Sequence, residues 1–317
     1  MPRVARSMED FRGDTPALCA FVAESWSENE QALAYTPDFI SGQLGYPGAG
    51  PALAPTMYED DVPVGFVAGF PRRVELNGRS LKLLVSALLS VAPRYKRVGL
   101  GGIMLGELAK RAQDGGFDGL VMYGVEGGPM NPMIMGLAAS LKLPTAHVRT
   151  IGYQSRLLFP KRVEAGPAHL QAAERLVELG NAINAPLRRR WTRAEAEWQC
   201  AGRPGAVVEL LEAEGRRGLL TGYVQQVADG DRPLCLFVDD ILWGDLSDEE
   251  RATLVKQFIA RGQAAGARIV VIPDLGYADL APFRAKPSPR VIHSYLSLFD
   301  GSGLPEGDLP AVYLDVF

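Results

Sequence analysis

Residues 90–107 read S-V-A-P-R-Y-K-R-V-G-L-G-G-I-M-L-G-E, and this stretch decides the fold of the chain. A mostly apolar run of strand length, residues 81–91, precedes it. Pro93 ends that run, because proline lacks a backbone donor and restricts the residue before it. From Ile103 onward the apolar positions keep helical spacing on one face. We therefore expect a buried strand, a glycine-rich turn and a helix.

The turn between strand and helix has the composition of an anion site. It contains three cations and three glycines, namely Arg94, Lys96, Arg97, Gly99, Gly101 and Gly102. A helix entered through glycines leaves backbone N–H groups unpaired at the positive end of its dipole, where phosphate binds. The dinucleotide fingerprint fails because its third glycine would fall at Met104, and no Gly-Lys-Ser/Thr of a Walker A loop follows. The alternative is a strand-to-helix turn without a ligand.

This stretch resembles motif A of the GCN5-related N-acetyltransferases, the GNAT superfamily, in which a strand ending V-x-P is followed by R/Q-x-x-G-x-G/A. Val91 and Pro93 match the first part, and residues 96–101 match the second with Lys96 in place of Arg or Gln. The resemblance implies that the loop amides hold the pyrophosphate of acetyl-CoA or another acyl-CoA, and that a backbone N–H near the strand end polarises the thioester. The implied cofactor-binding residues are Leu89, Val91, Lys96, Arg97, Val98, Gly99, Leu100, Gly101, Gly102 and Asn131.

The elements around this stretch follow the GNAT order. Turn signals at Asp60-Asp61 and Asn77-Gly78 separate three strands before the motif, and residues 120–125 form a buried strand after its helix. GNAT proteins commonly have an asparagine at the start of the next helix, which Asn131 matches. We expect a first GNAT domain over residues 1–160.

A second copy of the pattern follows a linker of Pro and Gly composition. Residues 65–70 recur as 218–223, and residues 116–122 recur as 266–272, in the same order at nearly the same offset. We expect a second GNAT-like domain over residues 168–317. The predicted fold class is α/β (α+β), with two tandem domains that each have a mixed, mostly antiparallel sheet flanked by helices.

The second copy lacks a usable cofactor loop. Its turn, residues 243–250, has one glycine and four carboxylates, so it would repel a pyrophosphate. Asp239 and Asp240 interrupt the strand before this turn, and a buried carboxylate without a partner is costly. They are candidates to hold a cationic substrate between the copies. The alternative is that these two carboxylates end the strand and pair with an arginine.

Catalytic groups are harder to assign than the cofactor loop. Glu126 is the candidate base because it ends the strand beside the expected thioester, and Tyr123 is the candidate acid or proton relay. An ordinary loop position for Glu126 and a packing role for Tyr123 are the alternatives. GNAT proteins often carry a tyrosine on the helix that residues 133–143 form here, where Ala138 stands instead.

Composition excludes several classes of protein. The 317 residues carry a net charge of −4, and the densest basic cluster, residues 188–190, is expected on a solvated helix or loop face, which argues against a nucleic-acid partner. The three cysteines have no metal spacing and suit a reducing compartment, the cytoplasm by default. The three histidines are too scattered for a zinc site, so no metal is expected. No signal segment or membrane-spanning run is visible.

The sequence thus predicts an acyl-CoA-dependent N-acetyltransferase that acts on a small-molecule amine, as a monomer or homodimer. A CoA-binding or regulatory protein without catalysis is an alternative, because the helix tyrosine is missing. A GNAT-like enzyme that uses a carrier-bound thioester is another.

Overall fold

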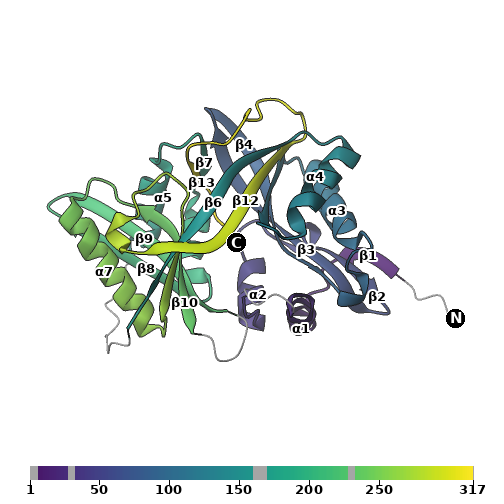
Figure 1. Cartoon of the computed structure of the whole chain (residues 1–317), viewed down its shortest axis with the longest axis horizontal. Coiled ribbons are helices and arrows are strands. Elements are labelled where there is room, and N and C mark those ends of the chain that lie inside the picture. The colour runs from purple at the N-terminus through teal and green to yellow at the C-terminus, as the bar shows by residue number, and fades with distance from the viewer. Residues whose placement is uncertain (1–5, 28–32, 160–169, 228–232, 317) are drawn as a thin grey trace.

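The computed structural model describes residues 6–27, 33–159, 170–227 and 233–316 (Figure 1). The first half contains strands β1 (Arg6–Asp10), β2 (Pro55–Glu59), β3 (Val62–Leu76), β4 (Arg79–Val91), β5 (Gly119–Val125) and β6 (Thr145–Leu157). Its helices are α1 (Thr15–Trp26), α2 (Pro37–Leu44), α3 (Leu100–Asp114) and α4 (Met130–Leu141). No helix in these described ranges is long and apolar enough to cross a membrane.

The second half repeats the order of strand, strand, helix and strand. Its strands are β7 (Leu187–Arg190), β8 (Ala206–Ala213), β9 (Arg216–Gln226), β10 (Leu234–Leu242), β11 (Ile269–Pro273), β12 (Lys286–Leu298) and β13 (Val312–Tyr313), and its helices are α5 (Ala172–Asn181), α6 (Arg193–Glu197) and α7 (Asp248–Ala264). The recurring segments 65–70 and 218–223 lie in β3 and β9, which occupy equivalent places. The predicted mixed, mostly antiparallel sheet flanked by helices is confirmed.

One sheet runs through both halves, because each half receives a strand from the other. The strand order is β1-β2-β3-β4-β5-β12-β6-β11-β10-β9-β8. β12, near the end of the chain, pairs with β5 and β6, and β6 pairs with β11. Figure 1 shows β6 and β12 crossing side by side from one half to the other.

Local signals explain several element boundaries in the first half. Asn77 and Gly78 both have positive φ (48° and 86°) and close the β3–β4 hairpin, while Asp60 and Asp61 do the same between β2 and β3. The side chain of Asp14 caps α1 and that of Thr36 caps α2. The two turns lie where the sequence predicts them.

Helices cover both faces of the first half. Gly69 of β3 faces α3, where an added Cβ would lie 3.0 Å from Leu108. The next residue, Phe70, points to the other face and contacts Tyr46, just after α2, in an edge-to-face arrangement. Met122 and Tyr123 of β5 point to opposite faces in the same way. Met122 packs in the hydrophobic cluster that contains the buried residues of α3, and Tyr123 packs against a second hydrophobic cluster.

Candidate functional site

The two parallel strands β4 and β5 separate before they end. They pair only over residues 83–85 and 119–121. Beyond these residues β4 pairs with β3 on one side only, and β5 pairs with β12. A bulge follows in β4, where Leu88 has a φ of 58° and its carbonyl accepts a hydrogen bond from the Ser90 hydroxyl. The facing edges of β4 and β5 are therefore not paired with each other beyond Val85 and Val121. We call this unpaired region the slot, and its backbone groups could pair with an extended ligand.

The first turn of α3 lies just after the wide end of this slot. Gly99 is the N-cap residue in the left-handed region (φ 87°), and no side chain caps the helix. The backbone N–H groups of the first turn are therefore available to an anion. An added Cβ at Gly99 or Gly102 would meet nothing within 4 Å, whereas one at Gly101 would lie 2.9 Å from Met133 on α4. A side chain at Gly101 would therefore require Met133 to shift, whereas Gly99 is favoured by the positive φ of the turn.

The basic residues of the loop differ in their roles. Arg94 is bound to Glu59 of β2 at 2.5 Å, and Tyr95 donates to the same carboxylate at 2.6 Å. These hydrogen bonds from Tyr95 and Arg94 lower the pKa of Glu59 to about 2. Arg97 is exposed with a φ of 67°. Arg94 therefore anchors the loop to the sheet, and Arg97 is free to approach a ligand.

The equivalent helix of the second half begins in a different way. The Ser247 side chain caps α7 and accepts from the Glu250 N–H, while the Glu250 carboxylate accepts from the Ser247 N–H. Asp248 and Glu249 occupy the same turn. The helix end is occupied by its own side chains. It is also surrounded by negative charge, as expected from the sequence.

Several solved structures are similar to this chain. N-myristoyltransferase of Saccharomyces cerevisiae with bound myristoyl-CoA is similar with a TM-score of 0.71 and 13% identity, over 94% of this chain and 83% of that chain. A putative acetyltransferase of Pyrococcus horikoshii has a TM-score of 0.56 and 14% identity, over 99% and 95%. A GCN5-related N-acetyltransferase of Kribbella flavida has a TM-score of 0.53 and 18% identity, over 94% and 72%.

The fold is that of the GCN5-related N-acetyltransferases. In sequence, no protein-family model and no curated protein matches this chain significantly. The GNAT fold predicted from residues 90–107 is therefore confirmed by structure alone.

The three remaining first-half candidates lie around the end of β5. Glu126 is exposed, and its backbone N–H donates to Val291 of β12. Asn131 in the first turn of α4 donates to the Val125 carbonyl at 3.1 Å and thereby fixes α4 to β5. Tyr123 donates its hydroxyl proton to the backbone carbonyl of Asp315 at 2.6 Å, and burial raises its pKa further above the usual range. The catalytic roles of Glu126 and Tyr123 stay predictions.

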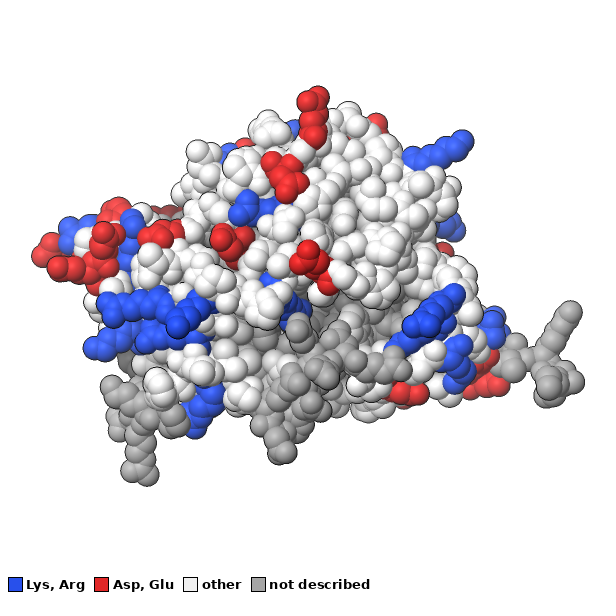
Figure 2. Space-filling model, in the orientation of Figure 1, with Lys and Arg blue, Asp and Glu red and all other residues white. Residues whose placement is uncertain are grey.

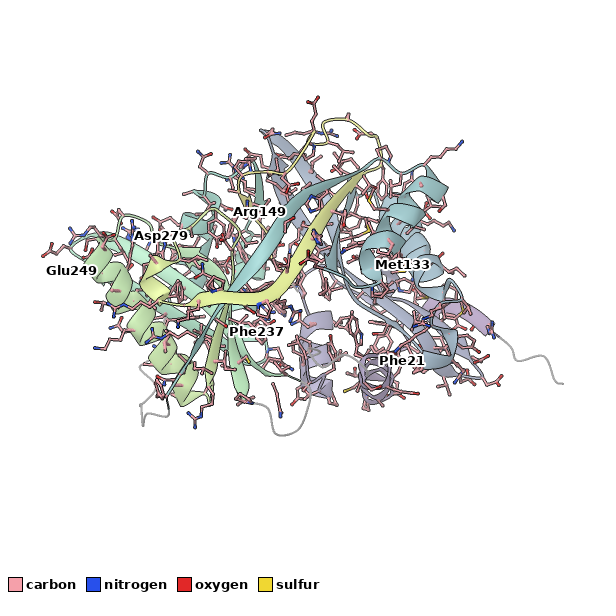
Figure 3. The ribbon with its side chains drawn as sticks, in the orientation of Figure 1. Phe21, Met133, Arg149, Phe237, Glu249 and Asp279 are labelled. Carbon is pink, nitrogen blue, oxygen red and sulfur yellow. The ribbon has the colours of Figure 1, made fainter. Side chains whose placement is uncertain are left out.

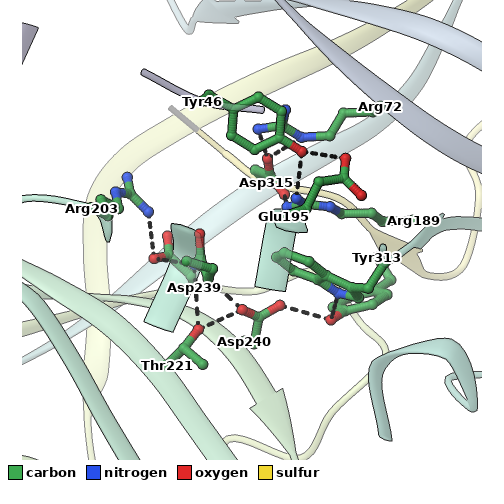
Figure 4. A network of polar contacts seen from close by, with 12 residues as sticks. Tyr46, Arg72, Arg189, Glu195, Arg203, Thr221, Asp239, Asp240, Tyr313 and Asp315 are labelled. Atoms are coloured by element: carbon green, nitrogen blue, oxygen red, sulfur yellow. Dashed lines mark hydrogen bonds and ion pairs between the residues drawn. The ribbon is translucent and has the colours of Figure 1, made fainter. Parts of the chain in front are cut away.

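Asp239 and Asp240 lie in the second half, and each has protein partners (Figure 4). Asp239 accepts from Arg203 at 2.6 Å and from Gln199 at 2.9 Å. Burial raises its pKa to about 7, although the charge of Arg203 opposes this. Asp240 accepts from the hydroxyls of Thr221 and Tyr313, and burial raises its pKa as well. A role in holding a cationic substrate is untested, while the pairing of Asp239 with an arginine is present.

The basic cluster 188–190 is not a solvated face, and this prediction is wrong. The three arginines form the short strand β7, which pairs with β3. Arg188 and Arg190 bind Glu75, and Arg189 is 1% exposed and bound to Asp315. Asp315 also binds the buried Arg72, so the end of the chain joins β3 to β7 (Figure 4). Single residues of unlike charge, far apart in sequence, give no local signal of this network.

Two of the three histidines are not scattered. The exchange of strands places His147 of β6 beside His293 of β12, with Nε2 and Nδ1 3.3 Å apart. Asp308 lies 2.6 Å from Nδ1 of His147. Within the described residues no group of three His, Cys, Asp or Glu side chains could hold a metal ion.

The surface gives no sign of a polyanion partner on the side shown. Figure 2 shows basic and acidic side chains interspersed, with a broad uncharged area over α4 and the adjacent strands. Nucleic-acid binding requires a concentrated basic face.

Proposed function

We propose that the chain is an acyl-CoA-dependent N-acyltransferase, with the cofactor bound in its first half and a small-molecule amine as acceptor. One observation carries this proposal: the slot between β4 and β5 opens next to the uncapped, glycine-lined start of α3. The same place in the second half is closed by the capping box of α7. The similar N-myristoyltransferase structure contains myristoyl-CoA, which supports an acyl-CoA as the donor.

The geometry is consistent with what acyl transfer needs from the protein. Residues 96–102 offer backbone N–H groups and positive charge to a pyrophosphate. The free side of β4 beyond Val85 offers backbone groups to the pantetheine, and an N–H at Leu89 or Val91 would polarise the thioester carbonyl. Positioning a neutral amine against the thioester then accounts for much of the rate. Glu126 or a water that it binds would take the amine proton.

Calorimetry with acetyl-CoA tests the cofactor site. Gly99→Val places a branched side chain at a φ of 87° in open space, within the loop. Gly13→Val is the matched control, because Gly13 has a φ of 91°, also has nothing within 4 Å of an added Cβ, and lies in the loop before α1. We expect Gly99→Val to lose at least about tenfold in affinity and Gly13→Val to bind like the natural chain, with similar losses of stability. Equal affinities in the two variants, or no binding by the natural chain, would refute the proposal.

A CoA-binding protein without turnover is the second candidate. It is favoured by the Tyr123 hydroxyl, which is committed to the Asp315 carbonyl, and by Ala138, which is buried where α4 would carry a tyrosine. Release of free thiol from acetyl-CoA in the presence of an amine library distinguishes the two. Steady release that depends on the amine excludes a purely binding role.

A further inference from the structure

The crossing strands β6 and β12 carry a polar cluster that takes no part in the proposed acyl-transfer site. His147 and Thr150 belong to β6, and His293 belongs to β12. Arg149, labelled in Figure 3, marks the part of β6 that pairs with β12. The two histidines are 146 positions apart in sequence, so the cluster exists only because the halves exchange strands.

A β-bulge at Val148 places these side chains on one face of the sheet. His147 and Thr150 are three positions apart, so they would point to opposite faces of a regular strand. The extra residue lets both lie on the face of Tyr295 and His293, their respective partners in β12. Bulges often re-aim a side chain in this way next to a functional site.

Three atoms of the cluster form a nearly equilateral triangle. Nε2 of His147 and Nδ1 of His293 are 3.3 Å apart, and Oγ1 of Thr150 lies 3.4 Å from each of these nitrogens. A tetrahedral zinc ion lies about 2.0–2.1 Å from imidazole nitrogens, which sets its ligand atoms about 3.3–3.4 Å apart. The triangle therefore has the size of one face of a zinc coordination tetrahedron.

Asp308 orients His147 for such an ion. Its carboxylate lies 2.6 Å from Nδ1 of His147, and the neighbouring Leu309 N–H donates to the Val148 carbonyl, which holds this segment against the bulge. A carboxylate only accepts hydrogen bonds, so Nδ1 carries the hydrogen, and in the neutral ring the lone pair lies on Nε2, at a corner of the triangle. Metal-bound histidines usually have such a partner on the second nitrogen. The charge of Asp308 also favours a cation nearby.

The triangle can be reached from solvent. The His147 side chain is 30% exposed, His293 is half-buried and Thr150 is exposed. The ring of Tyr295 packs edge-to-face against His147, with centroids 5.4 Å apart, and fixes its position. An ion that three protein atoms hold in this way keeps a fourth coordination position for water.

We propose that this cluster binds a divalent transition metal ion of the zinc type, which joins the two exchanged strands. His147, His293 and Thr150 are the ligands, and His293 then carries its hydrogen on Nε2. The described residues contain no group of three His, Cys, Asp or Glu side chains that could hold a metal, and the third ligand here is a hydroxyl. The expectation that no metal binds depends on scattered histidines, and the strand exchange removes that premise. The site does not require acyl transfer.

Calorimetry of the EDTA-dialysed full chain with Zn²⁺ and Mg²⁺ tests the site. We expect one Zn²⁺ ion to bind per chain and Mg²⁺, which prefers oxygen ligands, to bind at least about 100-fold more weakly. Zn²⁺ should also raise Tm, because its ligands are brought together only in the folded chain. A direct hydrogen bond between the two rings would hold them equally close without a metal. Absence of Zn²⁺ binding at about 100 μM, or equal binding of Mg²⁺, would overturn the proposal.

Variants then assign the ion to the cluster. We expect His147→Gln and His293→Gln each to lose at least about tenfold in Zn²⁺ affinity, and Asp308→Asn to lose about 10- to 100-fold. His169→Gln is the matched control, because it removes the third histidine of the chain by the same substitution. Urea unfolding without Zn²⁺ reports the folding of each variant. Equal Zn²⁺ affinities in His169→Gln and His293→Gln would refute the assignment, and an unchanged affinity in Thr150→Val would remove Thr150 from the ligands.

Discussion

Replacement of Asp315 by Asn tests whether the end of the chain holds the two halves together. The carboxylate binds Arg72 of β3 and Arg189 of β7, whose side chains are each 1% exposed. Both guanidiniums also lie over rings, Arg72 over Tyr46 at 3.8 Å and Arg189 over Trp191 at 3.3 Å. An amide in place of the carboxylate would remove the negative charge that these two buried guanidiniums share at Asp315.

Two estimates give the size of the effect. Removing one partner of a buried ion pair costs about 3–5 kcal/mol, out of a total stability of roughly 5–15 kcal/mol. Burial alone would raise the pKa of Asp315, but the charges of Arg189 and Arg72 outweigh it and lower the pKa to about 2. Measured from the ordinary value of 3.8, this shift is worth about 2 kcal/mol. Because the folded pKa lies below the unfolded one, this stability is present above about pH 4 and is lost as the pH falls through about 2.

Urea unfolding at pH 7 and along an acid series measures both effects. We expect Asp315→Asn to lower the free energy of unfolding by about 3–5 kcal/mol at pH 7 and to remove part of the loss below pH 4. Glu197→Gln is the control, because its pair with Arg193 is more than half exposed on both sides and is worth at most about 0.5 kcal/mol. A loss below about 1 kcal/mol would refute the stabilising role of Asp315. So would a decrease in the free energy of unfolding below pH 4 equal to that of the natural chain.

Two further predictions concern the carboxylates of Asp239 and Glu126. Asp239 has its pKa raised to about 7, so the folded state binds more protons than the unfolded one, and stability should fall as the pH rises from about 4 to about 7. Asp239→Asn should flatten this part of the urea-derived stability curve, and a curve like that of the natural chain would contradict it. Glu126→Gln should lower kcat by about 100-fold without changing acetyl-CoA affinity if Glu126 is the base. An unchanged kcat would exclude that role.

Local chemistry explains what could be predicted from the sequence. The strand before Pro93, the glycines and the helical spacing after Ile103 lie within about thirty residues, so their pattern depends little on the rest of the chain. The turn at Asn77-Gly78 is equally local, because both residues accept positive φ. The acidic turn before α7 is local as well, because its four carboxylates lie within residues 243–250.

Long-range pairing explains what could not be predicted. Arg189 and Asp315 are 126 positions apart, and His147 and His293 are 146 apart. Residues 188–190 look like a solvated cluster in the sequence, because burying three neighbouring charges is costly. The carboxylates that offset this cost are distant in sequence and are visible only in the structure.

The exchanged strands show why a repeat in sequence does not by itself define a domain. The boundaries proposed from the sequence, 1–160 and 168–317, separate two copies of strand, strand, helix and strand. In the structure, however, β5 pairs with β12 and β11 pairs with β6, so each copy is completed by a strand that lies across the proposed boundary. A fragment of residues 1–160 would leave the β5 edge without β12, and exposed strand edges favour association. The unit that folds is therefore expected to be the pair of copies, even where only one copy carries the cofactor loop.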